Sequence, residues 1–318
     1  MPTRHQRGTA IITALLVALL AASIAAFLLA QQSRALTRTA RATERAQAML
    51  FAQPMLHWTR SALFEFQKNY NSVDLTQRWA QPIGAQPIEG AMATGFFRDE
   101  AGRFNVNNLI NDDGKQNADN VAVFKRLLEN LGLNPDLALA LADWIDKDDE
   151  PGFPGGAENL TYLALPQPYR AANRRLVQIE ELTRVKGFDT ATVAKLKPFI
   201  TALPGSSKIN VNTAPQEVLA AALTGMVKTE LEELISRRMT RPFNALDGEN
   251  GIDAYFKKLP NAKGAQLLSF TSDYFSVALG ISTGGTQLRQ AALFQRVAAN
   301  PPGAKPTAWP RIIWVKDD

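Results

Sequence analysis

Acidic side chains crowd a short segment in the middle of the sequence, and they are its strongest candidates for chemistry. Five carboxylates lie within eight residues and a sixth follows in a glycine-rich turn: Asp143, Asp146, Asp148, Asp149, Glu150 and Glu158. Calcium takes about six to eight oxygen ligands, and carboxylates this close repel one another unless a cation neutralises them. A solvated acidic loop would contain the same residues, because the spacing is not that of an EF-hand. The residues alone leave both interpretations open.

The sequence contains no arrangement of residues typical of a catalytic site. Its two histidines, His5 and His57, lie far apart, and there is no cysteine. The nucleophile elbow of hydrolases, the Walker A loop and the dinucleotide-binding glycine fingerprint are all missing. The acidic cluster is better suited to holding a metal than to acting as an acid–base pair. We therefore predict a protein that is not an enzyme.

A second segment is typical of modules that bind nucleic acid. Residues 182–188 (LTRVKGF) precede a predicted helix, as in the helix-hairpin-helix motif, whose hairpin presents backbone N–H groups to a phosphate. Residues 209–214 (INVNTA) also occur in competence-type DNA-binding modules. Against DNA binding, the hairpin has a single glycine and three acidic neighbours, Glu180, Glu181 and Asp189. The net charge of +5, from 35 basic and 30 acidic residues, does not demand nucleic acid either.

The elements that position these segments begin with a long apolar helix. Residues 9–30 carry no charge, and as a helix they span roughly 33 Å, enough to cross a bilayer. The preceding eight residues end in Gly8, which is typical of a prepilin leader cut between Gly8 and Thr9. An ordinary secretory signal is instead cut at small residues after its apolar stretch, and the Ala-rich residues 23–26 could mimic such a site. The helical pattern continues to about Tyr70, and we expect Pro54 to kink or interrupt it.

Strand patterns bracket a helical block in the rest of the chain. Residues 81–95 are predicted to be a surface connection, and residues 96–109 a hairpin that turns at 100–102. Helices are expected within residues 118–203 and over 228–239, and Thr213 is the predicted N-cap of a helix that follows a strand. Strands are predicted at residues 274–281, 286–297 and 309–316, with a turn at Gly284 and Gly285 and a loop at residues 301–306. We found no convincing internal repeat. This order predicts an α-domain inserted into an α/β head.

Three blocks in this order resemble the K-type minor pseudopilins of bacterial type II secretion systems: LADWIDKDDEPGFPGGAENLTY, IEELTRVKGF and INVNTAPQEVLAAAL. Prepilins usually carry glutamate at the fifth mature position, which here is Thr13, and the K-type pseudopilins lack that glutamate. The resemblance covers nearly the whole chain. It implies an α/β (α+β) pilin-like fold: a long N-terminal helix on an antiparallel sheet, with an inserted all-α domain of the helix-hairpin-helix or SAM-like type.

The resemblance also implies the domain limits. Residues 1–8 would be the prepilin leader, 9–30 the transmembrane part of the helix and 31–70 the periplasmic stalk. Residues 71–111 and 207–318 would form the pilin-like head, and 112–206 the inserted α-domain. Arg34, Arg38, Arg41 and Arg45 follow the apolar run, whereas Arg4 and Arg7 precede it, so the positive-inside rule gives the opposite orientation. By that rule the N-terminus would lie outside the cytoplasm. We give precedence to the resemblance, which is more specific and places the bulk of the chain in the periplasm.

The function that the resemblance implies is assembly at the tip of the pseudopilus. The protein would sit in the inner membrane, be cut by prepilin peptidase, and join the I- and J-type minor pseudopilins in a tip complex that primes assembly and supports protein export. Other pseudopilins, the inner-membrane assembly platform, secreted proteins and the outer-membrane secretin are further expected partners. The resemblance implies structural calcium, for which we predict these ligands: Asp143, Asp146, Asp148, Glu150, Glu158 and Asn159. A membrane-tethered helix-hairpin-helix protein for DNA uptake is the alternative.

Overall fold

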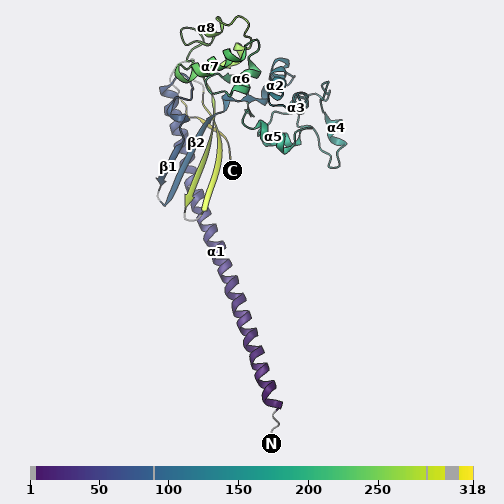
Figure 1. The fold of residues 1–318 in the computed structure, drawn as a ribbon, viewed down its shortest axis with the longest axis vertical. Coiled ribbons are helices and arrows are strands. Elements are labelled where there is room, and N and C mark those ends of the chain that lie inside the picture. Colours follow the sequence, from purple (N-terminus) through teal and green to yellow (C-terminus); the bar gives the residue numbers. More distant parts are fainter. Residues whose placement is uncertain (1–4, 89, 284–285, 298–307, 318) are drawn as a thin grey trace.

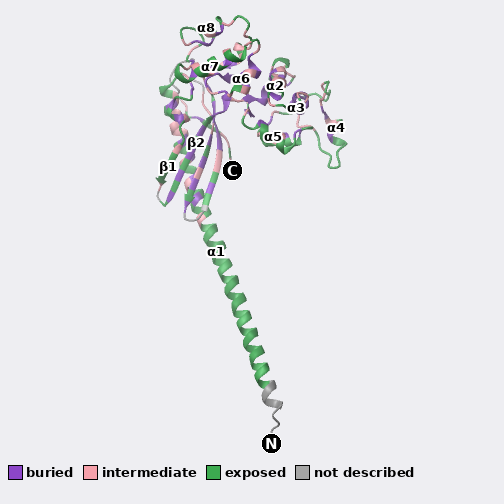
Figure 2. Cartoon of the chain, in the orientation of Figure 1, coloured by how far each residue is buried: buried purple, intermediate pink, exposed green. Residues whose placement is uncertain are grey.

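A single helix forms the N-terminal part of the computed structural model, which describes residues 5–88, 90–283, 286–297 and 308–317. This helix, α1 (His5–Asn69), extends far below the rest of the chain (Figure 1). Residues 10–43 are exposed throughout, as the green part of α1 shows (Figure 2). The predicted helix is confirmed, but the expected interruption is wrong, because Pro54 lies inside continuous helix. Among the described residues, this helix alone is long and apolar enough to cross a membrane.

The upper part of α1 packs on an antiparallel sheet. The sheet has the order β1-β2-β7-β8-β9, and every neighbouring pair is antiparallel. Its strands are β1 (Ile83–Ile88), β2 (Ala91–Asp99), β7 (Tyr274–Thr283), β8 (Thr286–Gln295) and β9 (Arg311–Asp317). Buried α1 side chains such as Leu56 and Leu63 pack against Phe97, Phe275 and Phe294 of the sheet. Burial of this apolar surface holds the helix to the head.

Two predictions for the segment after α1 are wrong. The Pro- and Gly-containing residues 81–95 form β1 and the first half of β2 rather than a loop. Pro87 is accommodated because β1 is an edge strand, where an N–H group is not needed on the outer side. Residues 96–109 form no hairpin: β2 ends at Asp99, and β3 (Phe104–Asn105) pairs in parallel with β4 (Ile200–Thr201).

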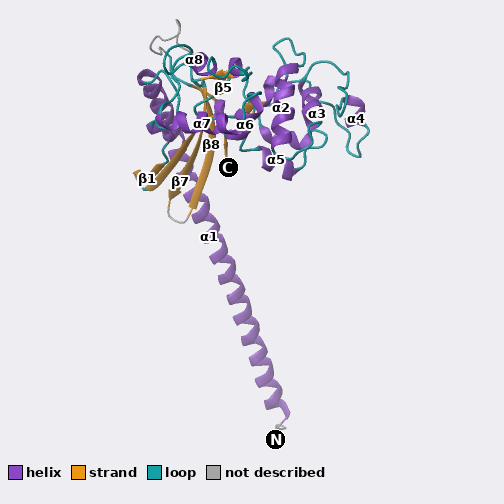
Figure 3. Cartoon of the chain, turned by 45° about the horizontal axis from the view of Figure 1, so that its top comes forward, coloured by secondary structure: helices purple, strands orange, loops and turns teal. Residues whose placement is uncertain are grey.

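The helical elements form a second body beside and above the sheet. Helices α2 to α5 lie to one side, whereas α6 to α8 lie over the end of the sheet (Figures 1 and 3). The helices are α2 (Ala118–Asn130), α3 (Leu137–Ile145), α4 (Asn159–Leu163), α5 (Thr190–Leu196), α6 (Gln216–Ala222), α7 (Lys228–Thr240) and α8 (Ile252–Phe256). One buried apolar cluster runs from Phe104 to Leu268 and therefore crosses the boundary predicted at residues 206 and 207.

The predictions for the C-terminal strands and for the strand before α6 are confirmed, whereas the predicted N-cap is wrong. The strands predicted near the C-terminus are β7, β8 and β9, and a strand does precede α6: β5 (Ile209–Asn210), which pairs with β6 (Leu268–Ser269). Thr213 is not the N-cap of α6, because that position is Pro215, and the Thr213 hydroxyl instead donates to Asp99. The predicted turn at residues 284–285 and the loop at 301–306 lie outside the described residues.

Candidate metal centre

Three carboxylates meet where α3 ends and α4 begins. Asp143 lies in the last turn of α3, Asp146 is the C-cap residue of that helix, and Glu158 is the N-cap residue of α4. One carboxylate oxygen from each lies within 4.8 Å of the other two. All three residues are buried, with exposed fractions of 0%, 1% and 3%. The chain between them folds back so that Glu158 returns to the helix end.

Asp143 is the anchor of this loop. Its Oδ2 atom accepts hydrogen bonds from the backbone N–H groups of Gly152, at 2.9 Å, and Ala157, at 2.8 Å. Its Oδ1 atom accepts from Gln116 Nε2 at 2.8 Å, and the same amide donates to Asp146 Oδ2 at 2.9 Å. These contacts hold the loop against α3 and align two of the three carboxylates.

Burial strongly disfavours negative charge in this cluster. Desolvation, with repulsion from Asp148 and the other carboxylates, raises the pKa of Asp146 to about 7. The same causes raise the pKa of Glu158 to about 8. The pKa of Asp143 is also raised, again mainly by desolvation, although its hydrogen bonds oppose the shift. Three buried carboxylates with raised pKa values are the arrangement that a bound cation would stabilise in the ionised form.

Several oxygens around the cluster lack a hydrogen-bond donor among the described residues. They are Oδ1 of Asp146, both carboxylate oxygens of Glu158, and Oδ1 of Asn173. Buried acceptors of this kind are costly unless something binds them. The donor set is made of oxygen atoms, which suits a hard cation such as calcium. The residues present therefore fit the predicted ion.

The glycines of the loop leave the space that this arrangement needs. A β-carbon at Gly156 would collide with Asp143 Oδ2 and with the backbone of Gly152. Gly156 also donates its N–H to the Gly152 carbonyl at 2.9 Å, which closes the turn. A side chain at this position would push the loop away from Asp143, and with it Glu158.

The structure separates the predicted ligands into two groups. Asp143, Asp146 and Glu158 come together, whereas Asp148 and Glu150 lie exposed on the loop. The amide of Asn159 is engaged within the protein: its Nδ2 atom donates to Asp149, and its Oδ1 atom accepts from the Ala171 N–H. Asp148, Glu150 and Asn159 stay predictions as ligands.

Two residues at the site were not expected from the sequence. Gln116 lies far away in the chain and reaches the cluster from the turn before α2. Asn173 lies beside it, because its N–H donates to the Trp144 carbonyl and its side chain to the Asp148 carbonyl. The positive φ of Asn173, 44°, fits asparagine better than most residues. A lone asparagine in a loop gives no pattern that could have identified it.

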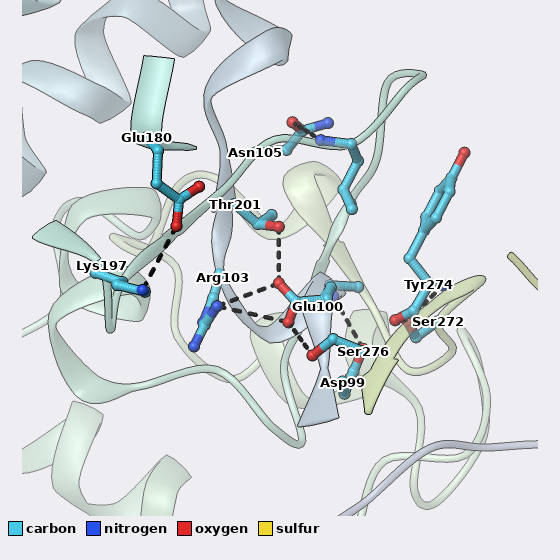
Figure 4. A network of polar contacts seen from close by, with 12 residues as sticks. Asp99, Glu100, Arg103, Asn105, Glu180, Lys197, Thr201, Ser272, Tyr274 and Ser276 are labelled. Atoms are coloured by element: carbon cyan, nitrogen blue, oxygen red, sulfur yellow. Dashed lines mark hydrogen bonds and ion pairs between the residues drawn. The ribbon is translucent and has the colours of Figure 1, made fainter. Parts of the chain in front are cut away.

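A buried polar network joins the sheet to the helical body at the end of β2 (Figure 4). Asp99, which is 4% exposed, accepts hydrogen bonds from the Ala101 N–H, Asn210 Nδ2 and the Thr213 hydroxyl at 2.9, 2.7 and 2.6 Å. Asn210 and Thr213 belong to the segment that leads into α6. A single carboxylate therefore ties β2 to the base of the upper helices.

Glu100, the next residue, is hydrogen-bonded to β7 of the sheet and to β4. Its two carboxylate oxygens accept from the hydroxyls of Ser276 in β7, at 2.6 Å, and Thr201 in β4, at 2.7 Å. Arg103 lies 3.3 Å from the same carboxylate and balances its charge (Figure 4). Together, Asp99 and Glu100 fix how the helical body is mounted on the sheet.

The structure contains a short internal repeat, although no convincing repeat is expected from the sequence. The tripeptide Asn-Val-Asn occurs ahead of α2 and again ahead of α6. In the first copy, Asn107 Oδ1 accepts from the Leu176 N–H and Nδ2 donates to the Leu176 carbonyl, each at 2.8 Å. In the second copy, Asn212 makes the same pair of contacts with Phe243, at 2.9 and 2.8 Å. The recurring tripeptide was the signal that could have indicated the repeat.

The hairpin proposed to contact a phosphate has other partners. It lies between a 3-10 helix (Ile179–Arg184) and α5, with Gly187 at a φ of 84°. Lys186 Nζ donates to the Gly156 carbonyl of the acidic loop at 3.4 Å. Lys197 lies 3.5 Å from Glu180. These lysines therefore contact the protein itself.

Known proteins resemble the chain over most of its length. Two family profiles described as type II secretion system (T2SS), protein K, match residues 102–205 and 209–278. Type II secretion system protein K of Pectobacterium carotovorum subsp. carotovorum is 31% identical, over 91% of this chain and 92% of that protein. The protein of the same name from Pseudomonas aeruginosa is 30% identical, over 92% of this chain and 90% of its own length.

A solved structure shares the fold. One chain of the crystal structure of the GspK-GspI-GspJ complex from the type 2 secretion system of enterotoxigenic Escherichia coli superposes with a TM-score of 0.68. The two chains are 25% identical, and the alignment covers 88% of this chain and 99% of the other.

Proposed function

The chain belongs to the type II secretion system protein K family, and from this premise we propose that it caps the tip of the pseudopilus as a minor pseudopilin. The observation that carries the proposal is the match to a chain of the GspK-GspI-GspJ complex over 88% of the molecule. The wide helical body over the end of the sheet supports the tip position (Figure 3), because it covers the surface on which a further subunit would stack. The protein acts by assembling, not by catalysis.

The proposed anchor is the exposed lower part of α1. Its apolar residues 9–30 cross the inner membrane, and the head lies in the periplasm. Prepilin peptidase removes residues 1–8 by cutting between Gly8 and Thr9, so that the helix stays in the mature protein. The bare helix below the head supports this use, since residues 10–43 bury no side chain in the chain itself.

The proposed metal is structural calcium held by Asp143, Asp146 and Glu158, with Asp148, Glu150 and Asn159 as further ligands. The unpartnered buried oxygens of Asp146, Glu158 and Asn173 support it. When bound, calcium supplies positive charge that lets the three buried carboxylates ionise together. Asp143 and Gln116 orient the site, and the loop carrying Glu158 becomes fixed to α3.

The hairpin at residues 182–188 belongs to a helix-hairpin-helix or SAM-like packing module in this proposal. Its lysine, Lys186, contacts the Gly156 carbonyl, and Lys197 at the end of α5 pairs with Glu180, which supports a role within the protein. Nothing in the described part of the structure favours the alternative of DNA uptake.

Co-expression with the I- and J-type minor pseudopilins of the same secretion system tests the proposed function. We expect the three full-length proteins to be extracted from the membrane and purified as one complex, with one copy of this chain. Mass photometry in detergent gives the stoichiometry, and a double-stranded DNA probe checks the alternative. Recovery of this chain without either subunit, or salt-sensitive DNA binding by the purified chain, would contradict the proposal.

A further inference from the structure

Four arginines form one line along α1 directly above the apolar run. Arg34, Arg38, Arg41 and Arg45 are separated by four, three and four residues, a spacing that places all of them on one face of a helix. All four are exposed. We call this line the arginine stripe.

The arginine stripe is the downward continuation of the face that packs on the sheet. At the same spacing of three or four residues, the next positions on this face are Ala48, Ala52 and Leu56, which are 0%, 4% and 1% exposed. The sheet ends at the level of Glu44, whose carbonyl accepts from the hydroxyl of Thr283 at the end of β7. The stripe therefore lies on the same side of α1 as the residues that pack on the sheet. Figure 2 shows that the helix is exposed below the sheet.

Most of the arginines in the stripe form no ion pair with the described residues. Of its four members, Arg45 alone has an ion-pair partner in the described part of the chain, Asp317, at 3.7 Å. Residues 31–50 contain these four arginines and a single acidic residue, Glu44. The segment therefore offers a partner a net charge of +3 along one side of an exposed helix.

The length of the stripe favours a helix as its partner over a lipid surface. At about 1.5 Å per residue, Arg34 lies roughly 6 Å beyond the apolar run and Arg45 roughly 22 Å beyond it. The headgroup layer on each side of a bilayer is only about 5–8 Å thick. Lipid headgroups could therefore reach the lowest arginine, but a second helix parallel to α1 could reach the whole line.

Small residues beside the stripe would let such a helix approach closely. Ala35, Ala42 and Ala46 are exposed and lie along the adjacent line of α1. Helices approach most closely where both backbones carry small side chains. A neighbour packed on these alanines would bring its own side chains opposite the arginines.

We propose that the arginine stripe binds the stalk helix of a neighbouring minor pseudopilin, which carries carboxylates at a matching spacing of three and four residues. The proposal rests on the proposed function, because a subunit at the tip has its neighbours below its head, where the stripe is exposed. The apolar helices provide the attraction, and the stripe sets which helix binds and at what height.

A pair of variants with equal charge change tests the proposal. Arg34→Gln, Arg38→Gln and Arg41→Gln together lower the net charge by three. The control combines Ser33→Glu, Thr43→Glu and Gln47→Glu, which also lowers it by three, but at exposed positions of α1 outside the stripe and the line of alanines. Each full-length protein is reconstituted in nanodiscs, and its affinity for the purified I- and J-type subunits is measured at low and high salt.

We expect the arginine variant to bind the two subunits about tenfold more weakly than the wild type at low salt, with little remaining salt dependence. The control should bind as the wild type does. Equal affinity of the arginine variant and the wild type would overturn the inference and leave the proposed function standing. A loss seen in phosphatidylglycerol nanodiscs but not in phosphatidylcholine nanodiscs would also overturn it, in favour of lipid headgroups. Failure of the wild type to bind at all would overturn both.

Discussion

Calcium at about one hundred times its dissociation constant is expected to raise the melting temperature of the detergent-solubilised protein by about 5–10 °C at pH 8. The reason is that the proposed site exists in the folded state only, where one carboxylate oxygen each of Asp143, Asp146 and Glu158 lies within 4.8 Å of the other two. Differential scanning fluorimetry with calcium, with magnesium and with chelator measures the shift. Magnesium should give a smaller shift, because it prefers a stricter octahedral site.

The calcium effect should depend on pH with a defined sign. Burial raises the pKa of Asp146 to about 7 and that of Glu158 to about 8, above the ordinary values of 3.8 and 4.5. The folded protein without metal therefore retains protons that the unfolded chain has released, so its stability falls as the pH rises from about 4 to 8. Calcium removes this loss by stabilising the ionised carboxylates. The shift in melting temperature should be larger at pH 8 than at pH 5.5.

The double variant Asp146→Asn and Glu158→Gln separates a metal site from a purely structural cluster. Without calcium at pH 8, this variant should melt at or above the wild type, because its neutral side chains no longer resist burial. Calcium should then leave its melting temperature unchanged. Glu129→Gln, at an exposed position on α2, is the matched control and should keep the full calcium effect. Identical melting curves of the wild type in calcium and chelator would rule out the site.

Asp99→Ala is expected to destabilise the protein by about 3–5 kcal/mol, because a buried network loses the acceptor that its members share. The substitution leaves two buried donors, the Ala101 N–H and Asn210 Nδ2, and the half-buried Thr213 hydroxyl without their acceptor. It also removes the hydrogen bonds that join the end of β2 to the segment leading into α6. Urea unfolding, followed by tryptophan fluorescence, measures the change in the free energy of unfolding.

Two further variants make the Asp99 prediction specific. Asp99→Asn keeps an oxygen acceptor and should lose less than half as much stability. Glu129→Ala, at an exposed position, should stay within about 0.5 kcal/mol of the wild type. Loss of less than about 1 kcal/mol in Asp99→Ala would contradict the view that this carboxylate holds the joint.

Local patterns predicted the long elements of this fold well. The helix of α1 and the strands β7 and β8 repeat their apolar residues at a regular period over many residues, and the structure contains them where expected. The predictions for short elements next to Pro and Gly are wrong. The composition of β1 predicts a loop, because it is that of a turn, and only the pairing with β2 makes this segment a strand.

The candidate metal site contains residues that the sequence pattern predicts and others that it does not. Asp143 and Asp146 could be paired from their spacing at a helix end, and the structure brings Glu158 to them. Gln116 and Asn173 could not be predicted, because they arrive through tertiary folding and not through spacing. The joint at Asp99 and Glu100 was hidden for the same reason, since two carboxylates at a strand end do not reveal that they are buried.

The N-terminal residue of the mature protein tests the pseudopilin assignment most directly. The chain is purified from membranes of cells with and without prepilin peptidase, and its intact mass and N-terminal sequence are determined. We expect a chain that starts at Thr9 when the peptidase is present, and one that keeps residues 1–8 when it is absent. A start beyond residue 23, or the same uncut chain in both strains, would contradict assembly through a retained N-terminal helix.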